Sequence, residues 1–570
     1  MTDTSTLGTT SPPDTAVPDA PVLGRWDRRA RLRLVPVLRP HWQFGLVLVA
    51  AAALRLIVIL GYPPVLWFND SYNYLIDAVA LTPDLVRPDG YPFLLALAHS
   101  LTLVSVLQAL MGVGMGTAIY AVLRHRGLPW QVAVLPALPV LFDVFELHLE
   151  HMIAADTLFT FLVTMALVIC CWSDRPPVAA VAGAGLLIGY ATLVRSVGEP
   201  LLAVFVLGML ARRAGWQRMA ALIVAAVVPV AAYAVWFHSF EGKYALTEAS
   251  GDFLYSRVST FAECKAMDPP ASLRVLCDPT PPSARPPAEE YLWADYEDMP
   301  YADQPTPLAA LTGNNNEYRF TKKIDSLTMR FAERAILAQP LAYLRVVADD
   351  TLHTFGWARQ PDPHDYTGNG PDFRFVSQSA LDSQVPWWTG NVPGDVQAVQ
   401  MYQARRDFGG ARLGDTRTVQ PWARLIQRYQ GFGYLPGTLL GLIVIVGGAG
   451  LLARRRRWGG VALLPWLTGV LLIVLPPMTA GFSYRYVLAA VPAACLAFGL
   501  TFALQPGDGG RRVLTWAPIS THLTEHALLK ARRRPKELLS FETDFTTCKN
   551  LQLMKSKSNP AVYGSPRLTR

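Results

Sequence analysis

The stretch that decides the fold is residues 43–62, QFGLVLVAAAALRLIVILGY, in which Arg55 is the one charged residue. A helix of about 20 residues crosses a hydrocarbon core of about 30 Å. Only 16% of the 570 residues are charged, whereas an average soluble protein carries about 25%. The sequence therefore predicts an integral membrane protein.

Further apolar segments follow this first one along the chain. We place them near residues 101–123, 130–145, 152–172, 178–195, 199–211, 219–237, 433–453, 459–476 and 485–504. Together they predict an all-α polytopic membrane protein with about ten transmembrane helices. The N-terminal transmembrane module covers 41–237, and the C-terminal transmembrane helices cover 433–504.

The basic residues of the short loops predict the orientation. If the helices alternate, the loops RHRG, ARRAGWQR and RRRRW fall on one side with the basic N-terminus. The connectors 63–92, 143–151 and 477–484 fall on the other side, and they contain a single Arg and no Lys. Because cytoplasmic loops carry the excess of Lys and Arg, we expect a multi-pass protein of the cell membrane with both termini in the cytoplasm. The net charge of +8 follows from this topology and does not indicate a nucleic-acid partner.

Three segments lie outside the predicted spans. Residues 1–40 predict a disordered, basic, cytoplasmic N-terminus, and 505–570 a basic cytoplasmic tail to which we assign no function. Residues 238–432 are too long for a simple connector and predict a mixed extracytoplasmic domain. This segment contains Cys264 and Cys277, which we expect to form a disulfide because the compartment is oxidising. The alternatives are two free thiols or pairing with other cysteines.

The first outer connector contains the candidate catalytic base. Asp70 follows Trp-Phe-Asn at the mouth of the first span, where desolvation by aromatic side chains could raise the pKa of its carboxyl group. Arg87 and Asp89 lie farther along the same connector. The alternative for each carboxylate is an ordinary solvated loop residue.

The second candidate acid is Asp156, inside the apolar segment 152–172. An ionisable group there costs roughly 2.5–3.5 kcal/mol on insertion scales, which makes it a functional candidate. His151 lies five residues earlier, about 140° away around a helix. The two residues could therefore share an ion only if the chain before Asp156 is unwound, and a helix cap is the alternative role for His151.

Arginines at the outer edges of two spans are candidate phosphate ligands. Arg195 ends the fifth segment and Arg485 begins the last one. A guanidinium group can bind a lipid phosphate through two hydrogen bonds, although plain interfacial anchoring is the alternative. Arg55, inside the first span, could pair with another intramembrane group that the sequence does not identify.

The motifs FNDSYNY, HMIAADTLFTFL and SYRYVLAAVP, together with the late outer domain, resemble the GT-C superfamily of membrane glycosyltransferases. The resemblance is greatest to the branch of phospholipid-carrier-dependent enzymes that contains protein O-mannosyltransferases and lipid A aminoarabinose transferases. It implies a GT-C-like fold and an inverting transfer from a polyprenyl-phosphate sugar to an acceptor glycan, lipid or protein.

The resemblance also implies roles for individual residues. Asp70 would act as general base, and Arg87, Arg195 and Arg485 would bind the phosphate, with Tyr484 and Asp89 near the substrate. The motif in this chain has Asn69 and Ser71 beside Asp70, so the second carboxylate is either Asp156 or Asp89. A divalent cation, Mg²⁺ or Mn²⁺, would take oxygen ligands from Asp70 and Asp156, with His151 as a further ligand.

Two other functions share this topology. A glycolipid transporter or flippase would place charged residues deep in several spans. A glycan ligase or polymerase would differ in using a diphosphate-linked donor.

Overall fold

The structure is a computed structural model, and it describes residues 41–293, 306–312, 320–357, 374–383, 406–408, 416–453 and 460–503. The chain divides into two units, Met1–Gln505 and Pro506–Arg570. The predicted N-terminal segment 1–40, the basic run 454–458 and the predicted tail 505–570 lie outside the described residues.

Helices occupy most of each predicted apolar segment, but they differ in length, and the helix within 152–172 begins only at Asp156. Five are long and apolar enough to cross a membrane, and a bent pair forms a sixth if it is counted as one span. The five are α2 (Trp42–Gly61), α5 (Leu101–His125), α12 (Trp216–Glu241), Gly460–Thr479 with η8 and α24 (Leu463–Thr479), and Tyr484–Thr501 with α25 (Tyr484–Leu488) and α26 (Val491–Thr501).

The prediction of about ten spans is not confirmed. Four apolar helices have only 10–17 residues, below the length that crosses the hydrocarbon core without help from neighbouring segments. They are α9 (Asp156–Trp172), α10 (Val178–Val194), α11 (Glu199–Ala211) and α23 (Gly437–Ala453). Within the described residues, length and composition thus support five or six spans.

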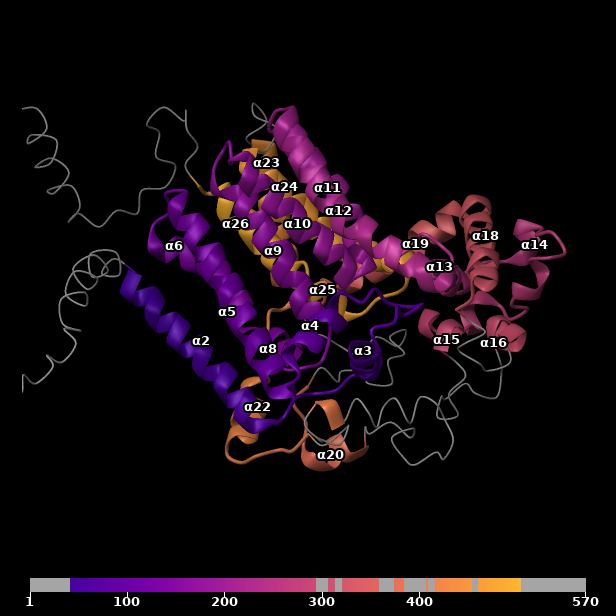
Figure 1. Cartoon of the computed structure of the whole chain (residues 1–570), viewed down its shortest axis with the longest axis horizontal. Helices are drawn as coiled ribbons and strands as arrows, with labels where there is room; N and C mark the ends of the chain where they lie inside the picture. Colours follow the sequence, from indigo (N-terminus) through magenta and orange to yellow (C-terminus); the bar gives the residue numbers. More distant parts are fainter. Residues whose placement is uncertain are drawn as a thin grey trace, which may run out of the picture. The chain divides into compact units, whose positions relative to one another are not determined.

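The helices pack as a bundle in which α10 contacts α9 and α12, and α26 contacts α23 and α24 (Figure 1). Small residues allow the closest approach. A Cβ atom on Gly185 or Gly189 of α10 would collide with carbonyl oxygens of α12, those of Leu222 and Ala226. Glycine at these positions lets two backbones meet, as is common where helices pack in a membrane.

The long segment between α12 and α23 contains a helical domain, which we call the loop domain. Its main helices are α13 (Ser250–Ser259), α15 (Ala288–Trp293), α18 (Lys322–Ala338) and α19 (Pro340–His353), and Figure 1 draws them together at one end of the bundle. In the described residues there is no strand beyond one isolated bridge, so this part is helical rather than mixed.

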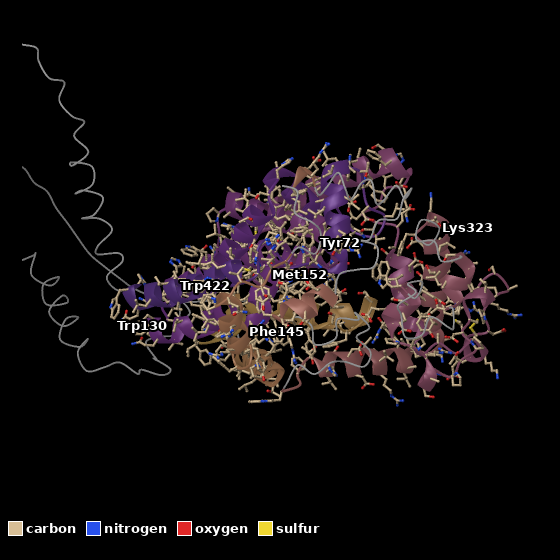
Figure 2. All side chains as sticks on the ribbon, turned by 90° about the horizontal axis from the view of Figure 1, so that it is seen from below. Tyr72, Trp130, Phe145, Met152, Lys323 and Trp422 are labelled. Atoms are coloured by element: carbon tan, nitrogen blue, oxygen red, sulfur yellow. A yellow bond between two sulfur atoms is a disulfide. The ribbon has the colours of Figure 1, made fainter. Side chains whose placement is uncertain are left out.

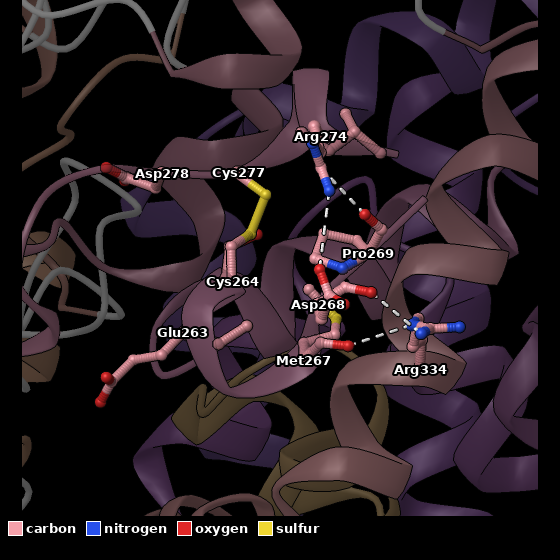
Figure 3. Close-up of a disulfide and its surroundings, with 12 residues drawn as sticks. Glu263, Cys264, Met267, Asp268, Pro269, Arg274, Cys277, Asp278 and Arg334 are labelled. Atoms are coloured by element: carbon pink, nitrogen blue, oxygen red, sulfur yellow. Dashed lines mark hydrogen bonds and ion pairs between the residues drawn. A yellow bond between two sulfur atoms is a disulfide. The ribbon is translucent and has the colours of Figure 1, made fainter. Parts of the chain in front are cut away.

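The predicted disulfide is confirmed in the loop domain. Cys264 and Cys277 are bonded, with their Cα atoms 5.9 Å apart (Figure 3). Beside it, Arg334 of α18 donates hydrogen bonds to the carbonyl oxygens of Met267 (3.2 Å) and Asp268 (3.0 Å). The short cross-linked loop is thereby fixed to the longest helix of the loop domain.

Basic connectors meet at the C-terminal end of α9. Arg126 donates to the carbonyl oxygen of Cys171, and Arg212 donates to that of Cys170. A helix C-terminus has unpaired carbonyls and a partial negative charge, which cations stabilise. We call this end of the bundle the basic end. Its orientation toward the cytoplasm stays a prediction.

Arg55 has a partner inside the bundle. Its Nη2 atom lies 2.6 Å from Oε1 of Glu150, and its Nη1 donates to the carbonyl oxygen of Leu141 at 2.9 Å. Gly112 makes room for the pair, because a Cβ atom there would collide with the Glu150 carboxylate. These bonds hold the bent pair Trp130–Phe142 and Val144–Glu150, whose axes differ by 54°.

Candidate active site

The connectors that carry Asp70 and Asp156 are joined by backbone hydrogen bonds. The amide of Leu66 donates to the carbonyl of His151 (2.9 Å), and the amide of Ile153 donates back to the carbonyl of Leu66 (3.1 Å). Ser71 adds a bond from its hydroxyl to the carbonyl of Ile153 at 2.7 Å. Figure 2 labels Met152 on this bridge and Tyr72 two residues after Asp70. The bridge brings the first and second connectors to one place.

Each candidate acid lies at the start of a helix. Asp70 is in the first turn of α3 (Asn69–Ala80), and Asp156 is the first residue of α9. The residues from His151 to Ala155 are not helical, so the chain before Asp156 is unwound. Unpaired amides and the helix dipole stabilise a carboxylate at such a position. We call this end of α9, opposite the basic end, the site end.

Three arginines surround the two carboxylates. Arg485 donates from Nη1 to Oδ2 of Asp70 at 3.2 Å, and its Nε lies 3.7 Å from Oδ1 of Asp156. Arg87 donates to Oδ1 of Asp70 at 2.7 Å, and Arg195 donates to Oδ1 of Asp156. We call these five residues the Arg/Asp cluster. All five were predicted from the sequence, and the structure brings them together.

Aromatic rings complete the cluster. The Arg485 guanidinium lies 4.4 Å from the ring centroid of Phe68 and 5.2 Å from that of Tyr486, and Arg195 lies 5.0 Å from the same Tyr486 ring. Cations are attracted to ring faces at these distances. Phe68 and Tyr486 were not selected from the sequence, although each belongs to a motif quoted above. Both could have been selected from the sequence, because Phe68 lies two positions before Asp70 and Tyr486 directly follows Arg485.

Tyr484 lies in a different environment. Its ring centroid is 4.8 Å from that of Phe482 and 6.0 Å from that of His353. Residues two positions apart on a helix point about 160° away from each other. The ring of Tyr486, by contrast, contacts Arg195 and Arg485.

The expected rise in the pKa of Asp70 is wrong. Burial alone would raise the pKa of this carboxyl group, but the charges of Arg87 and Arg485 outweigh burial and hold the pKa below its ordinary value. Asp70 is buried, with 8% of its surface exposed. The carboxylate is therefore ionised at neutral pH and is a weaker base than predicted.

Asp89 faces a tyrosine rather than the arginine cluster. Its Oδ2 accepts a hydrogen bond of 2.6 Å from the hydroxyl of Tyr233 in α12. Burial, and less strongly the charge of Asp84, raise the pKa of Asp89 to about 7. A carboxyl group that is partly protonated at neutral pH is poorly suited to be the second ionised acid.

The described residues do not form a cation site as they stand. Both ring nitrogens of His151 have partners: Nδ1 bonds the Ser105 hydroxyl (2.7 Å) and Nε2 the carbonyl oxygen of Tyr62 (2.8 Å). Asp70 and Asp156 face arginines, and across the described part of the chain no group of three or more His, Cys, Asp or Glu side chains could hold a metal ion. The ligand role of His151 is not supported, and the divalent cation stays a prediction.

The chain has few detectable similarities to known proteins. No family model and no curated protein matches the chain. Among solved structures it is similar to the apo form of the Archaeoglobus fulgidus oligosaccharyltransferase, with 14% identity and a TM-score of 0.34. The alignment covers 86% of this chain and 52% of that chain, about half of its length.

Proposed function

We propose that the protein is a membrane glycosyltransferase that moves a sugar from a polyprenyl-phosphate donor to an acceptor at the outer face of the membrane. The observation that carries the proposal is the Arg/Asp cluster. Two carboxylates and three guanidinium groups, from four separate parts of the chain, meet where apolar helices begin or end.

The arginines suit the phosphate of a lipid donor. Three guanidinium groups lie within ion-pair distance of one another's carboxylate partners, Asp70 and Asp156, and Arg87 also lies 3.9 Å from Asp84. Arg195 and Arg485 converge on Asp156, and a phosphate beside them would accept charge-assisted hydrogen bonds from both. Such donors stabilise the negative charge that develops on the departing lipid phosphate. The lipid chain of the donor would lie against the apolar helices that carry the arginines.

Asp70 would receive the acceptor proton. As the acceptor oxygen attacks the anomeric carbon, its proton moves to a carboxylate oxygen of Asp70. The bond from that carbon to the phosphate oxygen breaks, and the lipid phosphate leaves with the electron pair. A donor phosphate that draws Arg485 away from Asp70 also removes a positive neighbour, which raises the basicity of the carboxylate when the substrate is bound. One displacement of this kind inverts the anomeric centre.

Transfer of labelled sugar in reconstituted membranes tests this proposal. We expect Asp70→Asn to lower the transfer rate by roughly 10²–10⁴-fold, the usual contribution of a general base. Asp174→Asn is the matched control, because Asp174 pairs with Arg126 at the basic end. If Asp70→Asn transfers sugar as fast as the control variant, Asp70 is not the base.

The competing functions require different results. A flippase would move intact glycolipid across vesicles without transferring sugar. A ligase or polymerase would accept only diphosphate-linked donors, so the same assay is run with monophosphate and diphosphate lipids. Arg55, which lies inside the first span, is paired with Glu150 at 2.6 Å. Because its charge is already paired, Arg55 gives no specific support to a transport pathway.

A further inference from the structure

Helix α19 of the loop domain has an exposed apolar stripe. Leu341, Leu344 and Leu352 are 80%, 58% and 67% exposed, and Ala348 between them is also exposed. At 100° per residue these four positions fall within about 80° of one helix face. Val347 is buried on another side of the helix. Exposed leucines gathered on one face indicate a binding surface rather than scattered surface residues.

Two contacts fix α19 beside helices of the membrane bundle. The hydroxyl of Tyr343 donates to the carbonyl oxygen of Met478 (2.9 Å), near the C-terminal end of the span that contains α24. After the helix, the backbone of Thr354 and Gly356 lies against Gly437, the first residue of α23, where a Cβ atom would collide with both carbonyl oxygens. Helix α19 is therefore held at the ends of two apolar helices, and its stripe lies on the opposite side of the helix from Tyr343.

An exposed tryptophan follows α19 in the chain. Trp357 is 69% exposed and follows directly after the turn that packs on α23. Tryptophan is enriched where membrane and water meet, because its ring is apolar and its N–H group can bond water or head groups. The exposed stripe and the exposed indole thus lie on one short segment beside the membrane helices.

We propose that α19 and Trp357 form an interfacial element that inserts Leu341, Leu344 and Leu352 into the leaflet at the site end of the bundle. The partner is the lipid surface itself, contacted by a helix that lies in the interface rather than across it. Arg345, which is exposed beside the stripe, can extend its head toward lipid phosphates while its stem covers apolar surface.

The insertion would stabilise the connector that precedes Arg485. The ring of His353, the last residue of α19, has its centroid 4.9 Å from that of Phe482 and 6.0 Å from that of Tyr484. A helix anchored in the leaflet therefore supports the segment that positions Arg485. This role does not depend on the reaction that the cluster catalyses.

Lipid quenching of a fluorophore tests the insertion directly. In a Cys548→Ser background, the remaining thiols at Cys170, Cys171 and Cys495 are buried. Leu344→Cys is labelled with an environment-sensitive dye, and the full chain is reconstituted in phosphatidylcholine vesicles with and without lipid that carries a spin label on the upper acyl chain. Lys323→Cys is the control, because Lys323 is exposed on α18 of the same domain (Figure 2).

We expect the spin-labelled lipid to quench the dye at position 344 about twofold more strongly than at position 323, and iodide in the buffer to show the reverse order. Iodide quenching at 344 as strong as at 323 would show that water covers the stripe, and the proposal would be wrong. A dye at 344 that neither quencher reaches would show that protein covers the stripe, either a second copy or another segment of this chain. That result would also overturn the proposal.

Discussion

Arg485 and Asp70 are hydrogen bonded at 3.2 Å, although 415 positions separate them in the sequence. The bond joins the last apolar span to the connector after the first one. Because Arg485 also lies 3.7 Å from Asp156, one guanidinium group holds the two carboxylates on which the proposed reaction depends.

Replacing this arginine by lysine should lower activity even though the charge is kept. Arg485→Lys retains one positive charge but cannot contact both carboxylates in a fixed plane. Loss of a charged hydrogen bond costs about 1.5–3 kcal/mol, so we expect sugar transfer to fall roughly 10–100-fold. Arg126→Lys at the basic end is the control. Equal rates for the two variants would show that the bridging geometry of Arg485 is dispensable.

A methyl group at Gly112 should destabilise the bundle. The added Cβ would collide with the carboxylate of Glu150 and lie 2.7 Å from Nη2 of Arg55. Overpacking of this kind costs about 1–3 kcal/mol, so we expect Gly112→Ala to unfold at a lower temperature in detergent. Gly114→Ala is matched to it on the same helix, because the nearest atom to its Cβ would be 3.5 Å away, in the ring of Phe161. If both variants melt at the same temperature, the side chains of Arg55 and Glu150 can shift to accommodate the added Cβ atom.

The carboxyl group of Asp89 should make stability depend on pH. Burial raises its pKa to about 7 in the folded protein, against about 3.9 in an unfolded chain. Between these values the folded state binds more protons, so the free energy of unfolding falls as pH rises from about 4 to about 7. Asp89→Asn, which cannot ionise, should lose this part of the pH dependence.

The melting temperature of the wild type and of Asp89→Asn is measured at about pH 5 and about pH 8. The change in melting temperature between the two pH values is then compared between the two proteins. The lowered pKa of Asp70 acts in the opposite direction, because the stability that its ion pairs provide is lost in acid. The two proteins share that contribution, so it cancels in the comparison. An identical change with pH in both proteins would mean that Asp89 is ionised in the folded state.

Removing the disulfide should weaken the loop domain. Cys264 and Cys277 are 13 positions apart, and cross-linking a loop of this size stabilises by about 3 kcal/mol in the chain-entropy model. We expect Cys264→Ser/Cys277→Ser to be digested faster by protease between residues 250 and 353 than the wild type. Wild-type protein treated with a reductant should behave in the same way. Resistance equal to that of the oxidised wild type would mean that packing of Arg334 and α18 is sufficient.

Much of the candidate site follows from residue type and place in the sequence. Asp70, Asp156, Arg195 and Arg485 were selected because charge at the edge of an apolar segment is costly and therefore informative. The contacts of His151 and Tyr484 could not be predicted, because they are made with residues that are distant in the sequence. For His151 these are Ser105 and the carbonyl of Tyr62.

The pKa of Asp70 shows why local sequence is insufficient. The neighbouring aromatic residues indicated desolvation, and burial does act to raise the pKa. The sequence could not weigh burial against the charges of Arg87 and Arg485, because electrostatic energy depends on distance in space rather than along the chain. The net direction was therefore opposite to the prediction.

By itself, the sequence determined that the chain is a helical membrane protein and where most of its apolar helices lie. These properties depend on local composition, since a helix satisfies its own backbone hydrogen bonds and an apolar run favours lipid. Only the tertiary structure decided which helices are long enough to span, that Glu150 is the partner of Arg55, and that the connectors carrying Asp70 and Asp156 meet at Arg485. These properties depend on contacts between residues far apart in the chain, which the packing of the helices creates.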